Sequence, residues 1–139
     1  NKEYGSWFFI SEIVTTMRLP AAEIKETACL NCGKCIAACP THALTENGFD
    51  KNLCLSDITQ RKGELTPEQE ELIKKTGCAW GCDICQTVCP MNKKVKINPA
   101  EVFLDGIETT ARTDNISDRA YAWRGEKVIK RNLDIISGQ

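Results

Sequence analysis

The chain has 139 residues, the length of one ordinary domain, and its formal net charge of −1 gives no sign of a strongly acidic or basic protein. Nine cysteines are more than a chain of this size usually carries, so a specific use for them is expected. The longest uninterrupted apolar run, Trp7 to Ile10, is much shorter than the roughly 20 residues of a membrane-spanning helix, so no membrane association is predicted.

Residues 1–25 contain no cysteine and are predicted to be the end of a preceding domain. Ile10, Ile13, Val14 and Met17 recur at helical spacing, which predicts a short helix from about Ser6 to Arg18. The chain begins at Asn1 without an initiator methionine, so we expect it to be a fragment of a longer protein.

Residues 26–100 hold every cysteine, and between Cys29 and Pro40 they have the spacing C-x2-C-x2-C-x3-C-P. This spacing is typical of proteins that bind [4Fe–4S] clusters, because two-residue gaps let three thiolates of one loop bind three corners of a cubane. Gly33 lets the backbone approach closely, so that amide N–H groups can point at the sulfur atoms. Disulfides are disfavoured by the odd count and tight clustering of the cysteines. Zinc is disfavoured because its sites usually take two spaced pairs of ligands.

A second run, from Cys78 to Pro90, repeats the ending C-x2-C-x3-C-P, which predicts an internal duplication that holds two clusters. In such an arrangement the cysteine before each proline binds the other cluster. The first cluster is therefore assigned to Cys29, Cys32, Cys35 and Cys89. The second is assigned to Cys39, Cys82 and Cys85 and needs a fourth ligand. Cys78 and Cys54 are both candidates, and their spacing does not decide between them.

Residues 101–139 lack cysteine and are predicted to be a C-terminal helical segment that is cut short. A helix is expected from Ser117 to Ile136, with Gly125 as its weak point. Its expected buried face consists of Ala120, Trp123, Val128, Leu133 and Ile136. Basic side chains here and after the last cysteine motif are candidates for contacts with RNA phosphates, although a charged run is more often a solvated face. They are Lys93, Lys94, Lys96, Arg119, Arg124, Lys127, Lys130 and Arg131.

The sequence resembles the epoxyqueuosine reductases, cobalamin-dependent iron–sulfur enzymes of tRNA queuosine synthesis. The resemblance is carried by GSWFF at Gly5 to Phe9, CPTHAL at Cys39 to Leu44, GCDICQ at Gly81 to Gln86 and VCPMN at Val88 to Asn92, together with Cys54 and the residues behind it. It covers nearly the whole chain, although the family more often has Trp in place of Met91.

This resemblance implies that Cys54 is the fourth ligand of the second cluster, with Cys78 as the alternative ligand. It also implies that residues 1–25 end a corrinoid-type domain and that Ser6 contacts the corrinoid. Asp83 is a further candidate for this contact, because it lies between two predicted ligands, where its charge would tune the cluster or meet the edge of the cofactor. The cobalamin and the proposed proton donor of the family would lie in the rest of the parent protein. No catalytic residue is therefore assigned in this chain.

The function that the resemblance implies is electron transfer within a cytoplasmic oxidoreductase. The chain would take electrons from a donor such as a ferredoxin or flavodoxin and pass them to a cobalamin that reduces epoxyqueuosine in tRNA to queuosine. The chain alone is not expected to be catalytic. The alternatives are a part of a corrinoid-dependent reductive dehalogenase and a free-standing two-cluster ferredoxin that shuttles electrons between redox partners. The GSWFF segment and the C-terminal helix favour the reductase, because a small shuttle ferredoxin needs neither.

The predicted fold class is α+β, with a bacterial-type two-[4Fe–4S] ferredoxin-like core at residues 26–100. This core would contain two short β-hairpins and two short helices that open near Cys35 and Cys85. A helical insertion from about Thr45 to Gly77 widens it, and Thr66 is predicted to cap a surface helix there that only spaces the two cysteine motifs. Few large apolar residues lie near the cysteines, so the form without clusters is predicted to be unfolded or molten.

Overall fold

A computed structural model gives the structure of the protein and describes residues 3–23, 29–95 and 105–138. The α-helices in these ranges are α1 (Lys34–Ala38), α2 (Leu55–Gln60), α3 (Pro67–Thr76), α4 (Ile84–Thr87) and α5 (Glu126–Ser137). The strands are β1 (Leu44–Thr45) and β2 (Gly48–Phe49), and the 3-10 helices are η1 (Lys51–Leu53), η2 (Pro90–Asn92) and η4 (Ala122–Arg124). None of the helices described is long and apolar enough to cross a membrane.

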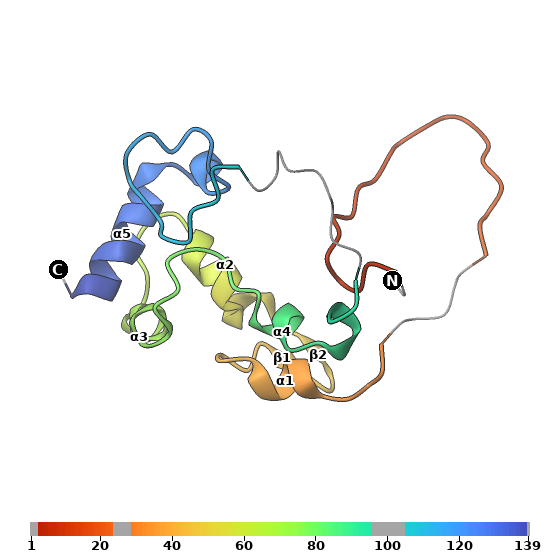
Figure 1. The fold of residues 1–139 in the computed structure, drawn as a ribbon, viewed down its shortest axis with the longest axis horizontal. Coiled ribbons are helices and arrows are strands. Elements are labelled where there is room, and N and C mark those ends of the chain that lie inside the picture. Colours follow the sequence, from red (N-terminus) through yellow and green to blue (C-terminus); the bar gives the residue numbers. More distant parts are fainter. Residues whose placement is uncertain (1–2, 24–28, 96–104, 139) are drawn as a thin grey trace.

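The helices form two groups (Figure 1). In one group α2, α3 and α5 pack against one another, and in the other α1 packs against α4 and the small sheet. The first group holds the hydrophobic core, in which Leu55, Ile58 and Ile73 are almost completely buried. Ile135 and Ile136 of α5 pack against this cluster from the C-terminal end of the chain. The core of the described residues therefore lies beside the cysteine motifs rather than among them.

Helix α3 begins and ends where local sequence signals place its ends. The Thr66 hydroxyl accepts from the Gln69 amide, the Gln69 side chain accepts from the Thr66 amide, and Pro67 takes the first helical position. Gly77 ends the helix in the left-handed conformation, with φ of 63°. This confirms the predicted cap. The helix is more than a spacer, because Ile73 is 0% exposed and α3 packs on α5.

Helices α1 and α4 are short, and neither contains a buried residue. They include Cys35 and Cys85 respectively, which confirms the prediction that two short helices open near these cysteines. The strands β1 and β2 form one antiparallel hairpin that pairs Leu44 with Phe49. Short helices with a small sheet fit the α+β class. A second hairpin is not present in the part of the chain that the structure describes, so the complete ferredoxin-like core remains a prediction.

The helix predicted from Ser6 to Arg18 is wrong, because this segment contains only turns and irregular backbone. Figure 1 shows it as a long loop outside the two groups of helices. Its large apolar side chains are exposed, and Phe9 and Val14 are 100% exposed. Helices in proteins draw most of their stability from packing, and the β-branched residues of this segment lower helix propensity further. Without a surface to pack against, the helical spacing of its apolar residues does not produce a helix.

The C-terminal helix is confirmed, but it is shorter than predicted. It begins at Glu126, because Gly125 has φ of 89° and ψ of 160° and interrupts the helical backbone. Val128 is buried as expected and Leu133 and Ile136 are half-buried, whereas Ala120 and Trp123 are exposed and lie before the helix. The domain boundaries predicted at residues 25–26 and 100–101 lie outside the described residues and remain predictions.

Candidate metal centre

Four thiols from two distant parts of the chain surround one cavity of about 450 Å³. Cys29, Cys32 and Cys35 come from the loop that leads into α1, and Cys89 comes from the turn after α4. The packing of α1 against α4 brings these two parts together. These are the four residues predicted to hold the first cluster. An all-thiolate set around a cavity suits an iron–sulfur cluster, for which four cysteine ligands are the usual requirement.

The loop before α1 has the backbone conformation that such a site needs. Asn31 and Gly33 have φ of 50° and 68°, which turns the chain tightly between the first three cysteines. The amide of Asn31 donates a hydrogen bond to Sγ of Cys29 at 3.4 Å. An amide directed at a ligand sulfur stabilises negative charge on that sulfur. The sequence predicts such amides for this loop, because Gly33 lets the backbone approach closely.

The second predicted set lies at the ends of three helices, α1, α2 and α4. Cys39 ends α1, Cys54 is the N-cap of α2, and Cys82 and Cys85 flank the start of α4. Burial raises the pKa of Cys82, and the charges of Cys54, Asp83 and Cys39 raise it further. Burial, Cys82 and Cys54 raise the pKa of Cys85. Cys54 is therefore an electrostatic neighbour of both cysteines of the second motif.

Cys39 differs from these thiols because hydrogen bonds stabilise its thiolate. Burial tends to raise the pKa of Cys39, but bonds from the Thr41 hydroxyl and from the amides of Thr41, Leu44 and Ala43 outweigh this effect and lower the pKa. The Sγ atom of Cys39 lies 3.6 Å from Oγ1 of Thr41. The turn after α1 thus favours the charged form that a metal ligand requires.

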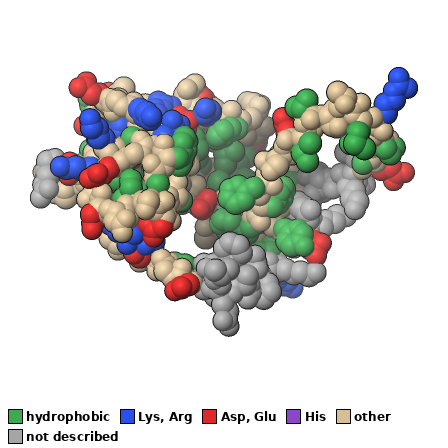
Figure 2. Space-filling model, turned by 90° about the horizontal axis from the view of Figure 1, so that it is seen from above, with side chains coloured by type: hydrophobic (Ala, Val, Ile, Leu, Met, Phe, Trp, Pro, Cys, Tyr) green, Lys and Arg blue, Asp and Glu red, His purple; other side chains and the backbone are tan. Residues whose placement is uncertain are grey.

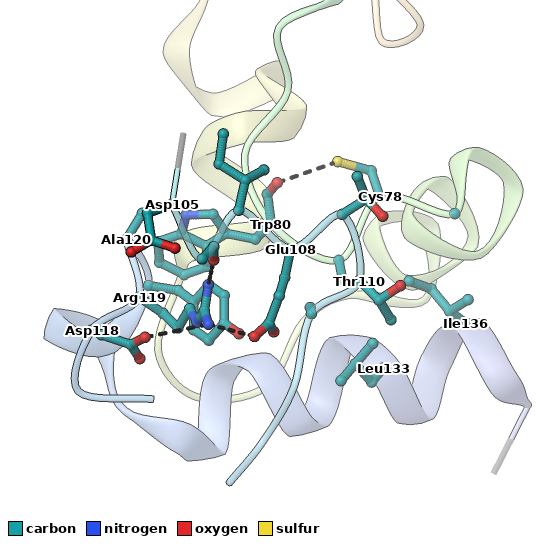
Figure 3. Close-up of a pocket in the computed structure, with 17 residues that line it drawn as sticks. Cys78, Trp80, Asp105, Glu108, Thr110, Asp118, Arg119, Ala120, Leu133 and Ile136 are labelled. Atoms are coloured by element: carbon teal, nitrogen blue, oxygen red, sulfur yellow. Dashed lines mark hydrogen bonds and ion pairs between the residues drawn. The ribbon is translucent and has the colours of Figure 1, made fainter. Parts of the chain in front are cut away.

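Cys78 has different surroundings. Its Sγ donates to the carbonyl oxygen of Gly81, and its side chain packs against the cluster of Leu55, Ile58 and Ile73. Burial raises the pKa of Cys78, and the charges of Cys82 and Asp83 add to this effect, whereas Cys54 is not among the causes. Cys78 also lines a separate cavity of about 680 Å³ between residues 77–80, α5 and the segments at 105–111 and 118–121 (Figure 3).

Ser6 and Asp83, the residues expected to contact a corrinoid, belong to one hydrogen-bonded network on the surface. Gln86 joins them, because its Nε2 donates to Oδ1 of Asp83 at 2.7 Å and its Oε1 accepts from the Ser6 hydroxyl at 3.1 Å. The Asn92 side chain accepts from the Ser6 amide and donates to the Ser6 hydroxyl, both at 2.8 Å. Both Ser6 and Asp83 are exposed, so a polar ligand edge has access to them.

Sequence reasoning assigned no role to Gln86 and Asn92. They contact residues about 80 positions away in the chain, and nothing in the local sequence signals such a contact.

Within residues 3–23, 29–95 and 105–138, no three His, Cys, Asp or Glu side chains are arranged to bind one metal ion.

Comparison with known proteins adds to this geometry. The family model of the 4Fe-4S double cluster binding domain matches residues 28–92, the part that holds all nine cysteines. An epoxyqueuosine reductase of Lactococcus garvieae is 34% identical over 147 aligned positions, which include 96% of this chain and 41% of the relative. The corresponding protein of Listeria monocytogenes is 32% identical over 148 positions, with 96% of this chain and 38% of the relative covered.

Solved structures of epoxyqueuosine reductases also match this chain. The structure of epoxyqueuosine reductase from Streptococcus thermophilus matches with a TM-score of 0.71 and 30% identity, over 98% of this chain and 39% of that one. A crystal structure of epoxyqueuosine reductase with a tRNA-Tyr epoxyqueuosine-modified tRNA stem loop matches with a TM-score of 0.61 and 32% identity, over 85% of this chain and 34% of that one. The chain thus spans about two fifths of the length of these relatives.

Proposed function

Because the chain belongs to the epoxyqueuosine reductase family and contains a 4Fe-4S double cluster binding domain, we propose that it conducts single electrons through two [4Fe–4S] clusters to the reaction centre of a longer enzyme. The observation that carries the proposal is the cavity surrounded by Cys29, Cys32, Cys35 and Cys89. These thiols come from both cysteine motifs, as an exchange of ligands between two clusters requires. A single local site would not need a cysteine from each motif.

For the second cluster we assign Cys39, Cys54, Cys82 and Cys85 as ligands. The electrostatic proximity of Cys54 to Cys82 and Cys85 supports this choice, as does the proximity of Cys39 to Cys82. Cys78 is the weaker candidate, because its thiol donates to the carbonyl oxygen of Gly81. Cys78 would then be a structural thiol beside the site.

When bound, each cluster would supply one-electron transfer, and a cobalamin held by the parent protein would supply the cobalt centre for the reduction of epoxyqueuosine in tRNA to queuosine. This chain's residues hold and tune the site. The Asn31 amide and the Thr41 hydroxyl direct hydrogen bonds at Cys29 and Cys39 and so stabilise their negative charge. Ser6 and Asp83 present a hydroxyl and a carboxylate at the surface, where they would contact polar groups at the corrinoid edge.

The remaining parts of the proposal concern the parent protein. Residues 1–25 would complete a corrinoid-type domain, residues 26–100 would form the two-cluster domain, and residues 101–139 would begin a further helical segment. The exposed apolar side chains of residues 7–19 fit the first assignment, because they would be covered by the rest of such a domain. The substrate would be tRNA, the electron donor would be a ferredoxin or flavodoxin, and the enzyme would act in the cytoplasm.

The test is the amount of iron and acid-labile sulfide per chain in anaerobically purified protein, with EPR spectra after reduction by dithionite. We expect about eight iron and eight sulfide for the wild type. Cys54→Ala should lose roughly half of both, whereas Cys78→Ala, the same substitution in a neighbouring thiol, should lose little. Loss in Cys78→Ala alone would reassign the fourth ligand. Zinc without sulfide would overturn the proposal.

A further inference from the structure

A hydrogen-bonded network joins α5 to the two segments that carry Cys54 and Cys82. Its central side chains are Thr59, near the end of α2, and Asn132, in α5. Charged side chains cover much of the surface over this group of helices (Figure 2), whereas Thr59 and Asn132 are 0% exposed. A buried polar side chain costs free energy unless its hydrogen bonds are formed, so the bonds of these two residues restrict how the three segments can pack.

Thr59 and Asn132 bond to each other and to the loop before Cys82. Nδ2 of Asn132 donates to the carbonyl oxygens of Thr59 and Ala79. The Thr59 hydroxyl donates to the carbonyl oxygen of Ser56, 3.1 Å away, and accepts from the Gly81 amide. Direct hydrogen bonds therefore hold together the end of α2, residues 79–81 and α5.

Arg131 fixes the orientation of the Asn132 amide. Its Nε and Nη2 donate to Oδ1 of Asn132 at 3.1 Å and 2.8 Å, so that Nδ2 faces the two carbonyl oxygens. Its Nη1 donates to the carbonyl oxygens of Gly63 and of Arg61, the latter 2.9 Å away, just after α2. The donors of a guanidinium lie in a fixed plane and hold such a set of acceptors together. Thr59, Arg131 and Asn132 thus form a clamp between α5 and the end of α2.

The clamp is connected to two ligands assigned to the second cluster. Cys54 is the N-cap of α2, and its carbonyl oxygen accepts from the Ile58 amide at 2.9 Å, so α2 leads directly from Cys54 to Thr59. Gly81 is covalently joined to Cys82. The clamp thereby fixes the segment that carries Cys54 relative to the segment that carries Cys82.

The first predicted set of ligands lies apart from the clamp. Its cavity is lined by residues 29–36, 45–46 and 89–91, and none of these belongs to α2 or α5. The family model of the double cluster domain ends at residue 92, before α5 begins. A role of the clamp at the clusters should therefore affect the second cluster and leave the first unchanged.

We infer that Thr59, Arg131 and Asn132 are positioning residues for the second cluster. They set the separation of Cys54 and Cys82 and, with it, the reduction potential of that cluster. This inference rests on the proposed function, which assigns these two cysteines to one cluster. The placement of ligands, hydrogen bonds to sulfur and the access of water all tune the potential of an iron–sulfur cluster. Helix α5 is then part of the cluster site although it contributes no ligand.

Loss of the Thr59 hydroxyl should make the potential of the second cluster less negative. In Thr59→Val the side chain keeps its shape, but the Gly81 amide next to Cys82 loses its acceptor. A released amide, or water that enters beside it, would stabilise the added electron on the neighbouring cluster. The reduced form of that cluster is therefore favoured.

The test is an anaerobic redox titration of the cluster-loaded chain, followed by EPR, which gives a midpoint potential for each cluster. We expect Thr59→Val to shift the reduction equilibrium of one cluster toward the reduced form by a factor of about ten or more, which corresponds to about 59 mV, and to leave the other unchanged. Asn132→Leu, which leaves Thr59 in place, should shift the same cluster in the same direction. Thr59→Ser keeps the acceptor and should match the wild type.

Thr76→Val is the matched control. It is the same substitution at a half-buried hydroxyl, but the two acceptors of the Thr76 hydroxyl are the carbonyl oxygens of Leu72 and Ile73, within α3. Its midpoint potentials should equal those of the wild type. An equal shift in Thr76→Val would overturn the inference, because a general loosening of the helices would then explain it.

Combination with Cys54→Ala identifies the cluster concerned. According to the proposed function, Cys54→Ala retains only the first cluster. The addition of Thr59→Val to this variant should leave the remaining midpoint potential unchanged. A shift there would overturn the inference, because the clamp would then act on the first cluster.

A folded, cluster-loaded Thr59→Val with the midpoint potentials of the wild type would also overturn the inference. Loss of about half of the iron and sulfide in Thr59→Val, restored in Thr59→Ser, would support it, because the second cluster would then need the clamp to assemble. Circular dichroism verifies that each variant is folded. Iron and sulfide content of the wild type tests the proposed function separately, so a loaded wild type whose potentials do not respond to the substitutions contradicts this inference alone.

Discussion

Nδ2 of Asn132 donates a hydrogen bond to the carbonyl oxygen of Ala79, 2.8 Å away and 53 positions earlier in the chain. The same nitrogen donates to the carbonyl oxygen of Thr59 at 2.7 Å, and the Asn132 side chain is 0% exposed. Thr59 in turn accepts a bond from the Gly81 amide through its hydroxyl, at 3.1 Å. One buried amide in α5 therefore fixes the end of α2 and the loop that leads to Cys82.

Replacement of Asn132 by Leu should destabilise the cluster-loaded protein. The substitution removes both donors and leaves two buried carbonyl oxygens without partners, at a cost of about 1 to 3 kcal/mol for each group. We expect the free energy of unfolding to fall by about 2 to 4 kcal/mol, measured by anaerobic denaturation in guanidinium chloride. Asn52→Ala is the control, because Asn52 is exposed, and it should change stability by less than about 0.5 kcal/mol. Equal stability of Asn132→Leu and wild type would show that the amide contributes no net stabilisation.

Replacement of Gly5 by Ala should detach the start of the chain from the turn after Cys89. Gly5 has φ of +60°, and an added Cβ would lie 1.9 Å from Oδ1 of Asn92. Either the Asn92 side chain or the backbone of residues 5–6 must move, so the bonds between Asn92 and Ser6 are lost. We expect opening of residues 5–8 to become at least tenfold more populated, which corresponds to about 1.4 kcal/mol. Hydrogen–deuterium exchange of peptides that cover these residues measures the change.

Gly106→Ala is the control, because it separates the steric clash of an added Cβ at Gly5 from the energetic cost of alanine at a positive φ. Gly106 has a similar φ of +68°, but nothing lies within 4 Å of an added Cβ. The Gly106→Ala variant therefore has the energetic cost of alanine in the left-handed backbone region, but no steric clash. Its exchange at residues 5–8 should match that of the wild type. If Gly5→Ala also exchanges like the wild type there, the contact between Ser6 and Asn92 does not hold the segment.

The sequence predicted local features well, because their signals lie within a few residues. The spacing of Cys29, Cys32 and Cys35 defines a loop that wraps one site, and α1 starts at that loop. The cap at Thr66 likewise needs only Pro67 and Gln69. Such features depend on hydrogen bonds between near neighbours, so no knowledge of the tertiary fold is required.

Features that depend on distant partners could not be predicted. Residues 6–18 have the apolar spacing of a helix, but no element among the described residues covers that face, and a sequence pattern alone does not show whether a partner is present. Asn132 is a polar residue on the buried face of α5, and its partners are carbonyl oxygens 73 and 53 positions away. Spacing also left Cys54 and Cys78 equivalent, whereas their different neighbours distinguish them.

Loss of the Thr66 hydroxyl should destabilise α3. Thr66→Ala removes the side-chain acceptor of the Gln69 amide and with it half of the capping box, although the amide still donates to the Thr66 carbonyl oxygen at 2.9 Å. We expect a loss of about 1 kcal/mol in the free energy of unfolding, measured by anaerobic denaturation. Thr66→Ser keeps an acceptor at the same position and should recover most of the loss. Thr110→Ala, at an exposed threonine outside any helix, should have no effect. A loss in Thr66→Ser as large as in Thr66→Ala would show that the cap is not the cause.

Removal of the clusters should unfold the two groups of helices unequally. Helices α1 and α4 contain no buried residue, so cluster ligands would supply most of their stabilisation. Helices α2, α3 and α5 bury Leu55, Ile73 and Ile129 against one another and depend less on the cysteines. Although the cysteine region alone predicts an apo form that is unfolded or molten, the packing of these three helices favours a partly folded one.

Hydrogen–deuterium exchange after anaerobic removal of iron by a chelator tests this difference. Amides of α1 and α4 should exchange at the rate of an unfolded chain, while those of α3 and α5 should keep at least tenfold protection. Full protection of α1 in the apo protein would mean that its packing on α4 suffices without a cluster. Complete loss of protection in α5 would mean that the helical core also needs the clusters. Cys82, which packs against Leu55, Ile58 and Ile73, would then be the link between the two groups.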